Sequence, residues 1–528
     1  MSKEFWACEI ENENHELETI YVCDKTARSR LTSAQVLDAL FRLPRNGKVY
    51  TVKIPKFAAN QSTTCTKLDD NANLVCAAST DTVAGQDDYA DIPLFRWYNC
   101  NYLRDDKGHA YPTAIEGIDA DYTTTGSVDV GVIQMAPYIK WDNTNDEYTI
   151  LSITDTPREG YTLWCEAISD GAEYPYVIHS KYISGIASDG LLRSQPNLAP
   201  ARNQSYNNMI TNYAKKGAGY FGAPESRNTW QIIFTLIKYA KKSSQEVFAG
   251  CSNYSFQYSA SMERATEEIY FPVAKAQAAN IIVGGCVSVG YGSNNNGAVN
   301  QDRSVTTMHQ YADDVRVTKI VDLDDNNSAV YLDIANGFTT TPIALTDELN
   351  APIVITSMHW RAGNTDAVVG HHDGSIGSNT NSKYPYRVQG VEYMVGGYTI
   401  SSDVVMDIQA DYSKNVLVCP AGQKRSSVDA TIRQTYINVG SMPGNNGDDY
   451  WIGDIDLDVS TGVAWSSGVG SGSTTGVGDR CYNGGKDTSG TRENLKGGNL
   501  WNGSYDGSSC VYCGDWLGWT YWGCLSAD

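Results

Sequence analysis

Residues 226–242 read SRNTWQIIFTLIKYAKK and carry the clearest helical pattern in the chain. Ser226 can cap the start of this helix, and the lysines near its end complement the negative end of the helix dipole. Apolar side chains at spacings of three and four residues share one face of a helix, and that face is expected to be buried. The side chains on this face are Trp230, Ile233, Phe234 and Ile237.

Two further helices are predicted, one just before this segment and one near the N-terminus. The first covers residues 203–214, and the second covers residues 32–43 with Thr32 or Ser33 as its N-cap. Their predicted core faces are formed by Tyr206, Met209, Ile210 and Tyr213, and by Val36, Leu37, Leu40 and Phe41.

Short strands are predicted on both sides of the helix pair. Residues in these stretches alternate in polarity or are β-branched, and loops rich in Asn, Asp and Gly separate them. The sequence therefore predicts a β-rich α+β fold. The predicted strands are 49–54, 127–135, 136–141 and 147–153 before the helices, and 280–290, 315–323, 328–334 and 352–358 after them.

The length of the chain predicts several domains. A chain of 528 residues is too long for one hydrophobic core, and we expect about three domains. Residues 1–155 read as a β-rich N-terminal domain, and residues 251–399 as a β-barrel or sandwich inserted into another domain. The interrupted domain would comprise residues 156–250 and 400–528.

The composition excludes several classes of partner. The formal net charge is −21, so nucleic acid and anionic membrane surfaces would repel the chain. No apolar run approaches the roughly 20 residues of a membrane span, and no N-terminal signal segment is evident. We expect synthesis in a cytosol where the 13 cysteines stay reduced. Cys510 and Cys513 form a single CxxC without a nearby histidine, which favours two small loop residues over a metal or redox site.

The segment from Gly497 to Asp528 has an unusual composition. It contains four Trp and three Tyr among Gly, Ser, Asp and Asn, and it has no Lys, Arg, Glu, Gln or Met. Rigid aromatic side chains among small adaptable ones are the mixture that binding surfaces use. The composition therefore indicates a ligand-binding surface. The alternative is a buried terminal strand pair whose Trp residues fill a core.

Residues 495–504, LKGGNLWNGS, resemble a known family when they are taken together with the helix pair and the glycine-rich stretch before them. This family is the C-type-lectin-like fold in its formylglycine-generating-enzyme-like version, where an Arg/Lys-Gly-Gly-Ser/Asn-Trp motif opens the last part of the domain. Lys496 to Asn499 match the motif, but Leu500 displaces the tryptophan by one position, to Trp501. The likeness covers about 155–528.

Within this fold the chain is similar to phage and prophage tail proteins, including those diversified by retroelements. The resemblance implies a receptor-binding protein at the virion tail tip, made in the host cytoplasm, commonly a trimer, and without enzymatic activity or cofactor. Its partners would be a host-surface protein or glycan and other tail proteins, and residues 1–155 would serve in virion attachment or oligomerisation. The similar segments are 227–234, 248–254, 383–390 and 462–468.

The resemblance also implies a variable region, for which residues 497–524 are the candidates. Randomised Asn codons give Tyr, Asp, Ser, Gly, Cys, Leu or Val, and they cannot give Lys, Glu, Gln, Met or Trp. Lys, Glu, Gln and Met are indeed absent after Lys496, whereas the tryptophans must come from other codons or be fixed. The expected scaffold residues are Gly497, Gly498, Trp501 and Trp522. The expected ligand-binding residues, held outward, are Asn499, Asn502, Ser504, Tyr505, Asp506, Ser508, Ser509, Tyr512, Asp515, Trp516, Trp519 and Tyr521.

Two other functions remain open. A tail-associated glycan-degrading enzyme needs two carboxylates across a cleft. Acidic residues are so abundant that solvated loop carboxylates explain the late aspartates better. A structural baseplate or capsid-decoration protein would instead bury residues 499–521 in a subunit interface. The late aspartates are Asp448, Asp449, Asp454, Asp456 and Asp458.

Metal binding is weighed at two places and is predicted at neither. His359, His371 and His372 lie near Asp373 in the sequence and could hold a transition metal, but a strand and a turn explain them better. Residues 322–327 resemble part of a calcium loop, yet they lack its glycine and distal glutamate, which favours an Asx-rich hairpin turn.

Overall fold

Strands dominate the computed structural model, with 35% of residues in strands and 14% in helices. The prediction of a β-rich fold is confirmed at this level. The structure describes residues 5–11, 17–24, 33–292, 306–346, 349–518 and 524–525.

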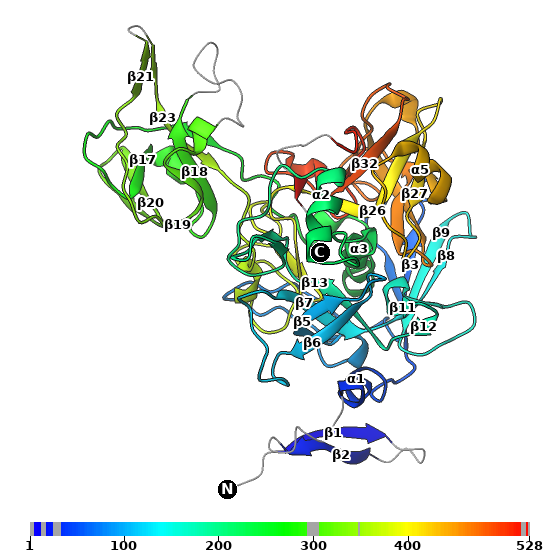
Figure 1. Cartoon of the computed structure of the whole chain (residues 1–528). Coiled ribbons are helices and arrows are strands. Elements are labelled where there is room, and N and C mark those ends of the chain that lie inside the picture. The colour runs from blue at the N-terminus through cyan, green and yellow to red at the C-terminus, as the bar shows by residue number, and fades with distance from the viewer. Residues whose placement is uncertain are drawn as a thin grey trace.

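Helix α3 (Glu225–Tyr239) lies at the centre of the main body, between the N-terminal strands and the C-terminal sheet (Figure 1). Its predicted face is buried, with Trp230 and Phe234 fully enclosed. Its polar face is buried too, including Glu225 and Arg227. The helix is therefore enclosed on all sides, whereas its sequence pattern predicted one buried face and one exposed face.

The start of α3 differs from the prediction. Pro224 occupies the N-cap position and offers no side-chain hydrogen bond. Asp403, from a strand far along the chain, accepts a hydrogen bond from the Glu225 N–H at 2.8 Å. A distant carboxylate thus satisfies a free helix donor, which a cap normally does locally. The predicted capping role of Ser226 is wrong, and its hydroxyl donates to Glu166 instead.

The helix predicted before α3 is confirmed. Helix α2 (Tyr206–Tyr213) follows Ser205, whose side chain accepts a hydrogen bond from the Asn208 N–H at 3.1 Å. Its expected core side chains are buried, except that Ile210 is partly exposed. Thr32, one expected cap of the first helix, lies outside the described residues. The other α-helices in the described part of the chain are α1 (Ser33–Phe41), α4 (Lys275–Ala278) and α5 (Asp429–Thr435).

Two antiparallel sheets form the N-terminal part of the main body, and they include the four strands predicted there. The first sheet has the order β10-β8-β9-β3-β4, and the second has the order β13-β7-β5-β6. The strands of the first are β3 (Val49–Pro55), β4 (Thr66–Asp69), β8 (Tyr138–Asp142), β9 (Tyr148–Thr154) and β10 (Thr162–Leu163). Those of the second are β5 (Trp97–Arg104), β6 (Ala110–Ile115), β7 (Asp129–Met135) and β13 (Tyr176–Ser180).

The largest hydrophobic core crosses residue 155, where we expected a domain boundary. Buried side chains before this position, such as Tyr50 and Val132, belong to the same cluster as Ile178 and the apolar side chains of α3. Tyr393, much later in the chain, belongs to it as well. Core packing therefore gives no boundary at 155, because α3 supplies the apolar cover of the N-terminal strands.

The C-terminal sheet is a nearly closed, barrel-like sheet of eight strands, with a short ninth strand paired to one of them. The order is β28-β27-β26-β32-β33-β31-β29-β30, and β34 (Cys524–Leu525) pairs with β26. The two end strands approach each other at Gly440, where an added Cβ would lie 2.3 Å from the Trp465 ring. The eight strands are β26 (Tyr398–Ile408), β27 (Lys414–Val418), β28 (Ile437–Met442), β29 (Tyr450–Asp458), β30 (Val463–Val469), β31 (Arg480–Tyr482), β32 (Thr491–Lys496) and β33 (Val511–Tyr512).

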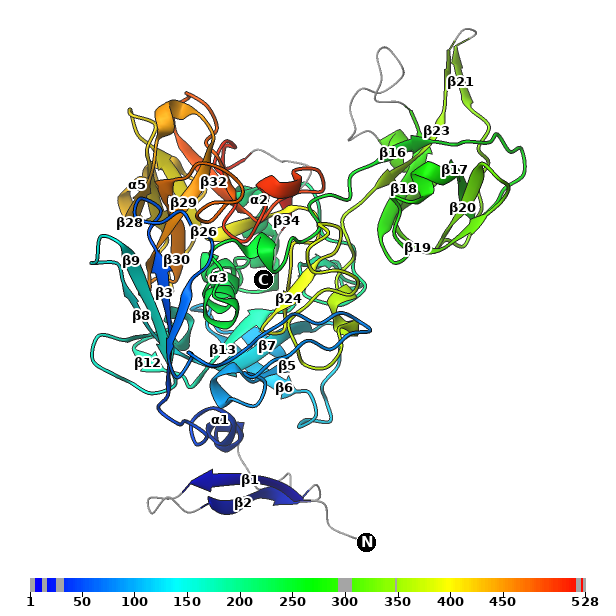
Figure 2. The same ribbon diagram turned by 180° about the vertical axis from the view of Figure 1, so that it is seen from behind.

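A six-stranded sheet projects from the main body, as both views show (Figures 1 and 2). Its order is β16-β23-β18-β19-β20-β17, and its apolar side chains belong to a buried cluster that also includes Ile183, Ala223 and Val395 from outside the sheet. Within the predicted inserted unit, 251–399, β24 (Tyr386–Val388) and β25 (Val391–Tyr393) pack in the core around α3. Its strands are β16 (Gln257–Ser259), β17 (Tyr270–Ala274), β18 (Cys286–Tyr291), β19 (Ala312–Asp322), β20 (Asn327–Leu332) and β23 (Ile353–Ser357).

Several two-stranded hairpins complete the fold. The N-terminal one lies at one end of the molecule, beside α1 (Figure 2). The hairpin strands are β1 (Phe5–Glu11) with β2 (Leu17–Asp24), β11 (Ile168–Ser169) with β12 (Ala172–Glu173), β14 (Gly185–Ile186) with β15 (Leu192–Arg193), and β21 (Ile343–Thr346) with β22 (Leu349–Ala351).

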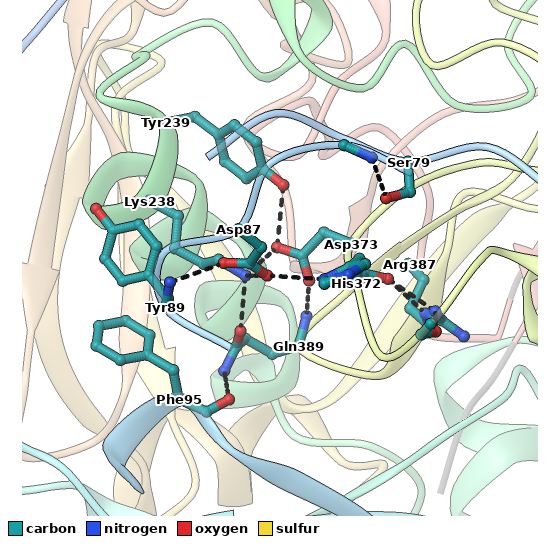
Figure 3. Close-up of polar contacts among 12 residues, drawn as sticks. Ser79, Asp87, Tyr89, Phe95, Lys238, Tyr239, His372, Asp373, Arg387 and Gln389 are labelled. Carbon is teal, nitrogen blue, oxygen red and sulfur yellow. Dashed lines mark hydrogen bonds and ion pairs between the residues drawn. The ribbon is translucent and has the colours of Figure 1, made fainter. Parts of the chain in front are cut away.

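A buried ionic cluster, formed by Lys238, Asp87 and Asp373, ties three distant segments together beneath the last turn of α3 (Figure 3). The Lys238 Nζ lies 2.7 Å from a carboxylate oxygen of Asp373 and 3.2 Å from one of Asp87. Gln389 accepts a further hydrogen bond from Lys238 at 3.1 Å. Burial alone would lower the pKa of Lys238, but Asp373 and the other negative neighbours outweigh it and raise that pKa. The cluster therefore holds two buried carboxylates around one buried ammonium group.

Candidate functional site

The candidate ligand-binding segment begins where β32 leaves the barrel. All six residues of β32 are buried, and it lies between β26 and β33 in the sheet. Gly497 then adopts φ = +89°, a conformation that favours glycine, and Gly498 packs directly against Asp506. A Cβ at Gly498 would lie 1.8 Å from the Asp506 carboxyl carbon. The two glycines therefore occupy positions that other residues would strain or overfill.

Asp506 closes the turn that follows the two glycines. One of its carboxylate oxygens accepts the Asn499 N–H at 2.8 Å, and the other accepts the Asn502 amide at 3.0 Å. Burial raises the pKa of Asp506 well above its usual range. The side chain is fully buried, so it supports the loop and does not face a ligand.

Asp479 holds the next part of the segment. Its side chain accepts the Ser509 N–H at 2.8 Å and the Gln245 amide at 3.2 Å. Burial raises the pKa of Asp479 to about 7. Gly507 fits against this carboxylate, since a Cβ there would lie 2.0 Å from an Asp479 oxygen. Residues 506–510 are therefore folded inward onto the start of β31.

For four of the residues expected to be held outward, the prediction is wrong. Asn499, Asp506, Ser508 and Ser509 are buried, because the loop uses its own polar groups as internal hydrogen-bond partners. The backbone of Ser508, for example, donates to Ser244 Oγ at 2.9 Å. The exposed members of the predicted set are Ser504, Tyr505 and Trp516, and the partly exposed members are Asn502, Tyr512 and Asp515.

The prediction for Trp501 is wrong in the opposite sense. We expected it in the core, but the side chain is 56% exposed. Leu500 takes the inward position instead and packs on the cluster that contains Tyr254. The Leu500 carbonyl accepts the Tyr254 N–H at 2.9 Å, which fixes the backbone at this point. Leu500, and not Trp501, is thus the side chain that packs inward at this point. Trp519, Tyr521 and Trp522 lie outside the described residues.

Three side chains form an aromatic and cationic surface cluster, Trp451–Arg480–Tyr505. The Trp451 and Tyr505 rings lie 5.2 Å apart in an edge-to-face arrangement. The Arg480 guanidinium lies 5.2 Å from the Trp451 ring centre and 5.8 Å from that of Tyr505. Trp451 and Arg480 are cross-strand partners of β29 and β31, so the barrel itself fixes two of the three. The cluster presents a rigid face with both aromatic and donor groups.

A second exposed aromatic, Trp516, stacks on Arg492. The guanidinium lies 3.7 Å from the indole centre, and Trp516 is 40% exposed. Arg492 is held by β32 and by an ion pair with Asp487 at 2.9 Å. Gly490 makes room for the indole, since a Cβ there would lie 2.2 Å from it. One face of Trp516 is thus fixed while part of the side chain remains available to a ligand.

Sequence reasoning missed Trp451, Arg480 and Arg492 as members of the candidate site. They precede the terminal segment and reach it through strand pairing, because β31 and β32 both pair with β33. Nothing in their local sequence marks them as surface partners of Tyr505 and Trp516. Knowledge of the strand order would have found them.

The other polar candidates take structural roles among the described residues. Asp454 accepts the Phe57 N–H at 3.0 Å and pairs with Lys242 at 2.8 Å. Asp456 accepts the Trp141 N–H at 2.7 Å. These two aspartates link the barrel to the N-terminal sheet. The expectation that they are solvated loop carboxylates is wrong. Asp448, Asp449 and Asp458 hold local loops through hydrogen bonds of their carbonyl or carboxylate oxygens.

The histidines have separate environments. His359 is buried, the His371 ring packs edge-on against Trp97, and His372 lies 3.5 Å from Asp87. Among the described residues, no group of three His, Cys, Asp or Glu side chains is arranged to hold a metal ion. The predicted Asx turn is confirmed, because Asp324 accepts the N–H groups of Asn326 and Asn327 between β19 and β20.

Cys510 and Cys513 of the CxxC are both fully buried. Cys513 follows β33 and interacts with Cys481, while Cys510 contacts Asp506. The two cysteines therefore fill interior space in the barrel wall. They act as small buried side chains, and they lie in the core and not in a surface loop.

No protein-family model matches the chain, and no curated protein matches it in sequence. Of the helices that the structure describes, none combines the length and the apolar character that crossing a bilayer requires.

Proposed function

We propose that this protein is a receptor-binding protein of a phage or prophage tail tip, and that residues 497–524 with the Trp451–Arg480–Tyr505 cluster form its ligand-binding surface. The observation that carries the proposal is the contrast within this segment between backbone and side chains. Its loop is clamped by buried Asp479 and Asp506, while Trp501 and Tyr505 point into solvent, 56% and 45% exposed. Large exposed aromatics on a fixed loop are costly to leave in water unless a partner covers them.

The finer architecture in this proposal is a C-type-lectin-like domain interrupted by the six-stranded unit. The helix pair, the glycine-glycine turn after β32 and the late strands support this reading. The N-terminal part would then serve in virion attachment or oligomerisation. A trimer would multiply a weak single-site affinity through effective concentration.

Whole-cell binding tests the proposal. The labelled full-length protein is incubated with a panel of intact bacterial isolates, and bound protein is measured by flow cytometry. We expect saturable binding to a subset of isolates. The double variant Trp501→Ala, Tyr505→Ala should weaken it by about tenfold or more, since anchor aromatics each contribute on the order of 2 kcal/mol.

The matched control is Tyr111→Ala, which removes a 38% exposed tyrosine on the N-terminal sheet. It should leave cell binding unchanged. Equal losses in both variants would contradict the assignment of the surface. A change of oligomeric state in the Trp501, Tyr505 variant would favour the structural alternative, in which this surface lies in a subunit interface. Release of sugar from purified envelopes would favour the glycan-degrading alternative.

A further inference from the structure

A cavity of about 520 Å³ lies beside the first turn of α3. The ionic cluster of Lys238 lies at the other end of this helix. The cavity wall is built by the β5–β6 turn, the helix α2–α3 loop, and the loop that follows β27. These pieces are hundreds of residues apart in the chain, so only the finished fold creates the space. Ala421, Gly422 and Gln423 on its rim are exposed, and the cavity therefore opens to solvent. Its volume falls in the range of small-molecule sites.

Glu166 forms one polar wall of the cavity. Its side chain is 18% exposed, accepts a hydrogen bond from Ser226, and lies 3.2 Å from the His179 ring nitrogen. Burial lowers the pKa of His179 well below its ordinary value, so the imidazole is neutral. Burial also raises the pKa of Glu166 to about 7. This carboxyl can accordingly donate or accept a hydrogen bond near neutral pH.

Asp403 forms a second polar wall. It comes from the irregular middle of β26, where the pairing with β32 shifts between Ile400 and Val405. One oxygen is held by the Glu225 N–H at 2.8 Å, which fixes the side chain against the start of α3. Burial raises the pKa of Asp403 to about 6, although Arg425 opposes this. Asp403 is thus a second positioned carboxyl that titrates close to neutrality.

The cavity wall carries charged groups of both signs. Arg104, Lys107 and Arg425 face the space together with Glu166, Asp170 and Asp403. The Arg425 guanidinium stacks 4.4 Å above the Phe221 ring, and an Arg104 nitrogen donates to the Gly108 carbonyl at 2.8 Å. Because the raised pKa values leave Glu166 and Asp403 partly protonated near neutral pH, the wall carries at most a small positive charge, and its field would concentrate a charged ligand only weakly.

We propose that this cavity is a second ligand site, which binds a neutral, hydroxyl-rich molecule of the size of one or two sugar rings. The two carboxyls and the guanidinium groups suit hydroxyls, which both donate and accept hydrogen bonds. Ile168 and Ile178 provide apolar wall for the C–H groups of such a ring. The inference does not depend on receptor binding by the C-terminal surface.

Calorimetry and saturation-transfer NMR on the full-length protein test this proposal. The neutral probes are glucose, galactose, mannose, N-acetylglucosamine, lactose and maltose, and the anionic probes are glucuronate and AMP. We expect at least one neutral sugar to bind saturably with a Kd of about 1 mM or tighter. Asp403→Asn and Glu166→Gln should each weaken this binding by about tenfold, because a hydrogen bond to a charged group contributes roughly 1.5–3 kcal/mol.

A blocking variant separates binding in the cavity from binding elsewhere. Ala421→Trp places a large ring at the exposed rim and should abolish sugar binding, while Ala72→Trp, on an exposed turn of the N-terminal sheet, should not. Unfolding curves of both variants are the check that they fold. The Trp501→Ala, Tyr505→Ala variant should keep its sugar affinity. Lack of binding by every neutral probe, preference for an anionic probe, or full binding by Ala421→Trp would each overturn the proposal.

Discussion

Two of the regions that contain buried carboxylates stabilise them in different ways. Beneath α3, Asp87 and Asp373 share the ammonium group of Lys238. In the terminal segment, Asp479 and Asp506 receive backbone N–H groups and side-chain amides. In the first arrangement a buried cation compensates part of the negative charge, and in the second only neutral donors stabilise it. A buried carboxyl held by neutral donors gains a proton more easily than one beside a buried cation.

The largest expected effect follows from removing the shared cation. Lys238→Met leaves Asp87 and Asp373 buried without a positive partner, which costs about 3–5 kcal/mol of unfolding free energy. Urea unfolding followed by circular dichroism measures this loss. Lys241→Met is the control, because Lys241 pairs with Glu246 where both side chains are partly exposed, and it should cost less than about 1 kcal/mol. Equal costs would end the distinction between the two kinds of ion pair.

The terminal segment should respond to crowding at its turn. In Gly498→Ala, the new Cβ would meet the Asp506 carboxyl carbon at 1.8 Å, and overpacking of this kind costs about 3 kcal/mol. Faster proteolysis of the C-terminal segment than of the α3 core would show that the damage is local. Gly472→Ala is the matched control, since nothing lies within 4 Å of a Cβ there. An unchanged proteolysis rate in Gly498→Ala would contradict the tight turn.

The pH dependence of stability distinguishes the two regions further. Asp479 has a folded pKa of about 7, raised by burial well above the usual range of an aspartate. A carboxyl with a raised folded pKa stabilises the fold below its unfolded pKa, and this contribution is lost as the pH rises through 7. Between pH 5 and pH 8 the wild type should therefore lose on the order of 2 kcal/mol more unfolding free energy than Asp479→Asn does. Parallel stability curves for the two proteins would rule out this account of Asp479.

The smallest expected effect concerns the stacked pair at the surface. Arg492→Lys keeps the positive charge near Asp487 but removes the planar group that lies 3.7 Å from the Trp516 ring centre. We expect a loss of about 1 kcal/mol and a change in tryptophan fluorescence. Arg433→Lys is the control. The Arg433 guanidinium pairs with Asp407 at 2.8 Å and stacks on no ring among the described residues, so the fluorescence should not change.

The sequence predicted the strands and helices well, because their periodicity is local. The apolar face of α3 and the strands at 49–54 and 147–153 are where the pattern placed them. The polar face of α3 could not be predicted as buried, since its partners Asp403 and Tyr393 come from distant strands. Chain position alone does not reveal which segments meet.

The candidate site was predicted in part for the same reason. The Gly497-Gly498 turn and the exposure of Tyr505 and Trp516 follow from local composition and from the motif. Local composition does not reveal that Ser508 and Ser509 are buried or that Trp501 is exposed. These outcomes depend on which side chain packs toward the core at each position. At this point Leu500 packs inward and Trp501 is exposed.

The complete enclosure of α3 has a consequence for how the chain acquires its structure. The groups that cover the helix arrive late: Tyr393 donates to the Arg227 carbonyl, the Ala464 N–H donates to Thr229, and Lys496 pairs with Glu225. Contacts of such long sequence separation slow folding and leave apolar surface exposed in the meantime. During synthesis the central helix therefore emerges long before its cover does, and a nascent chain ending shortly after α3 should need a chaperone to stay soluble.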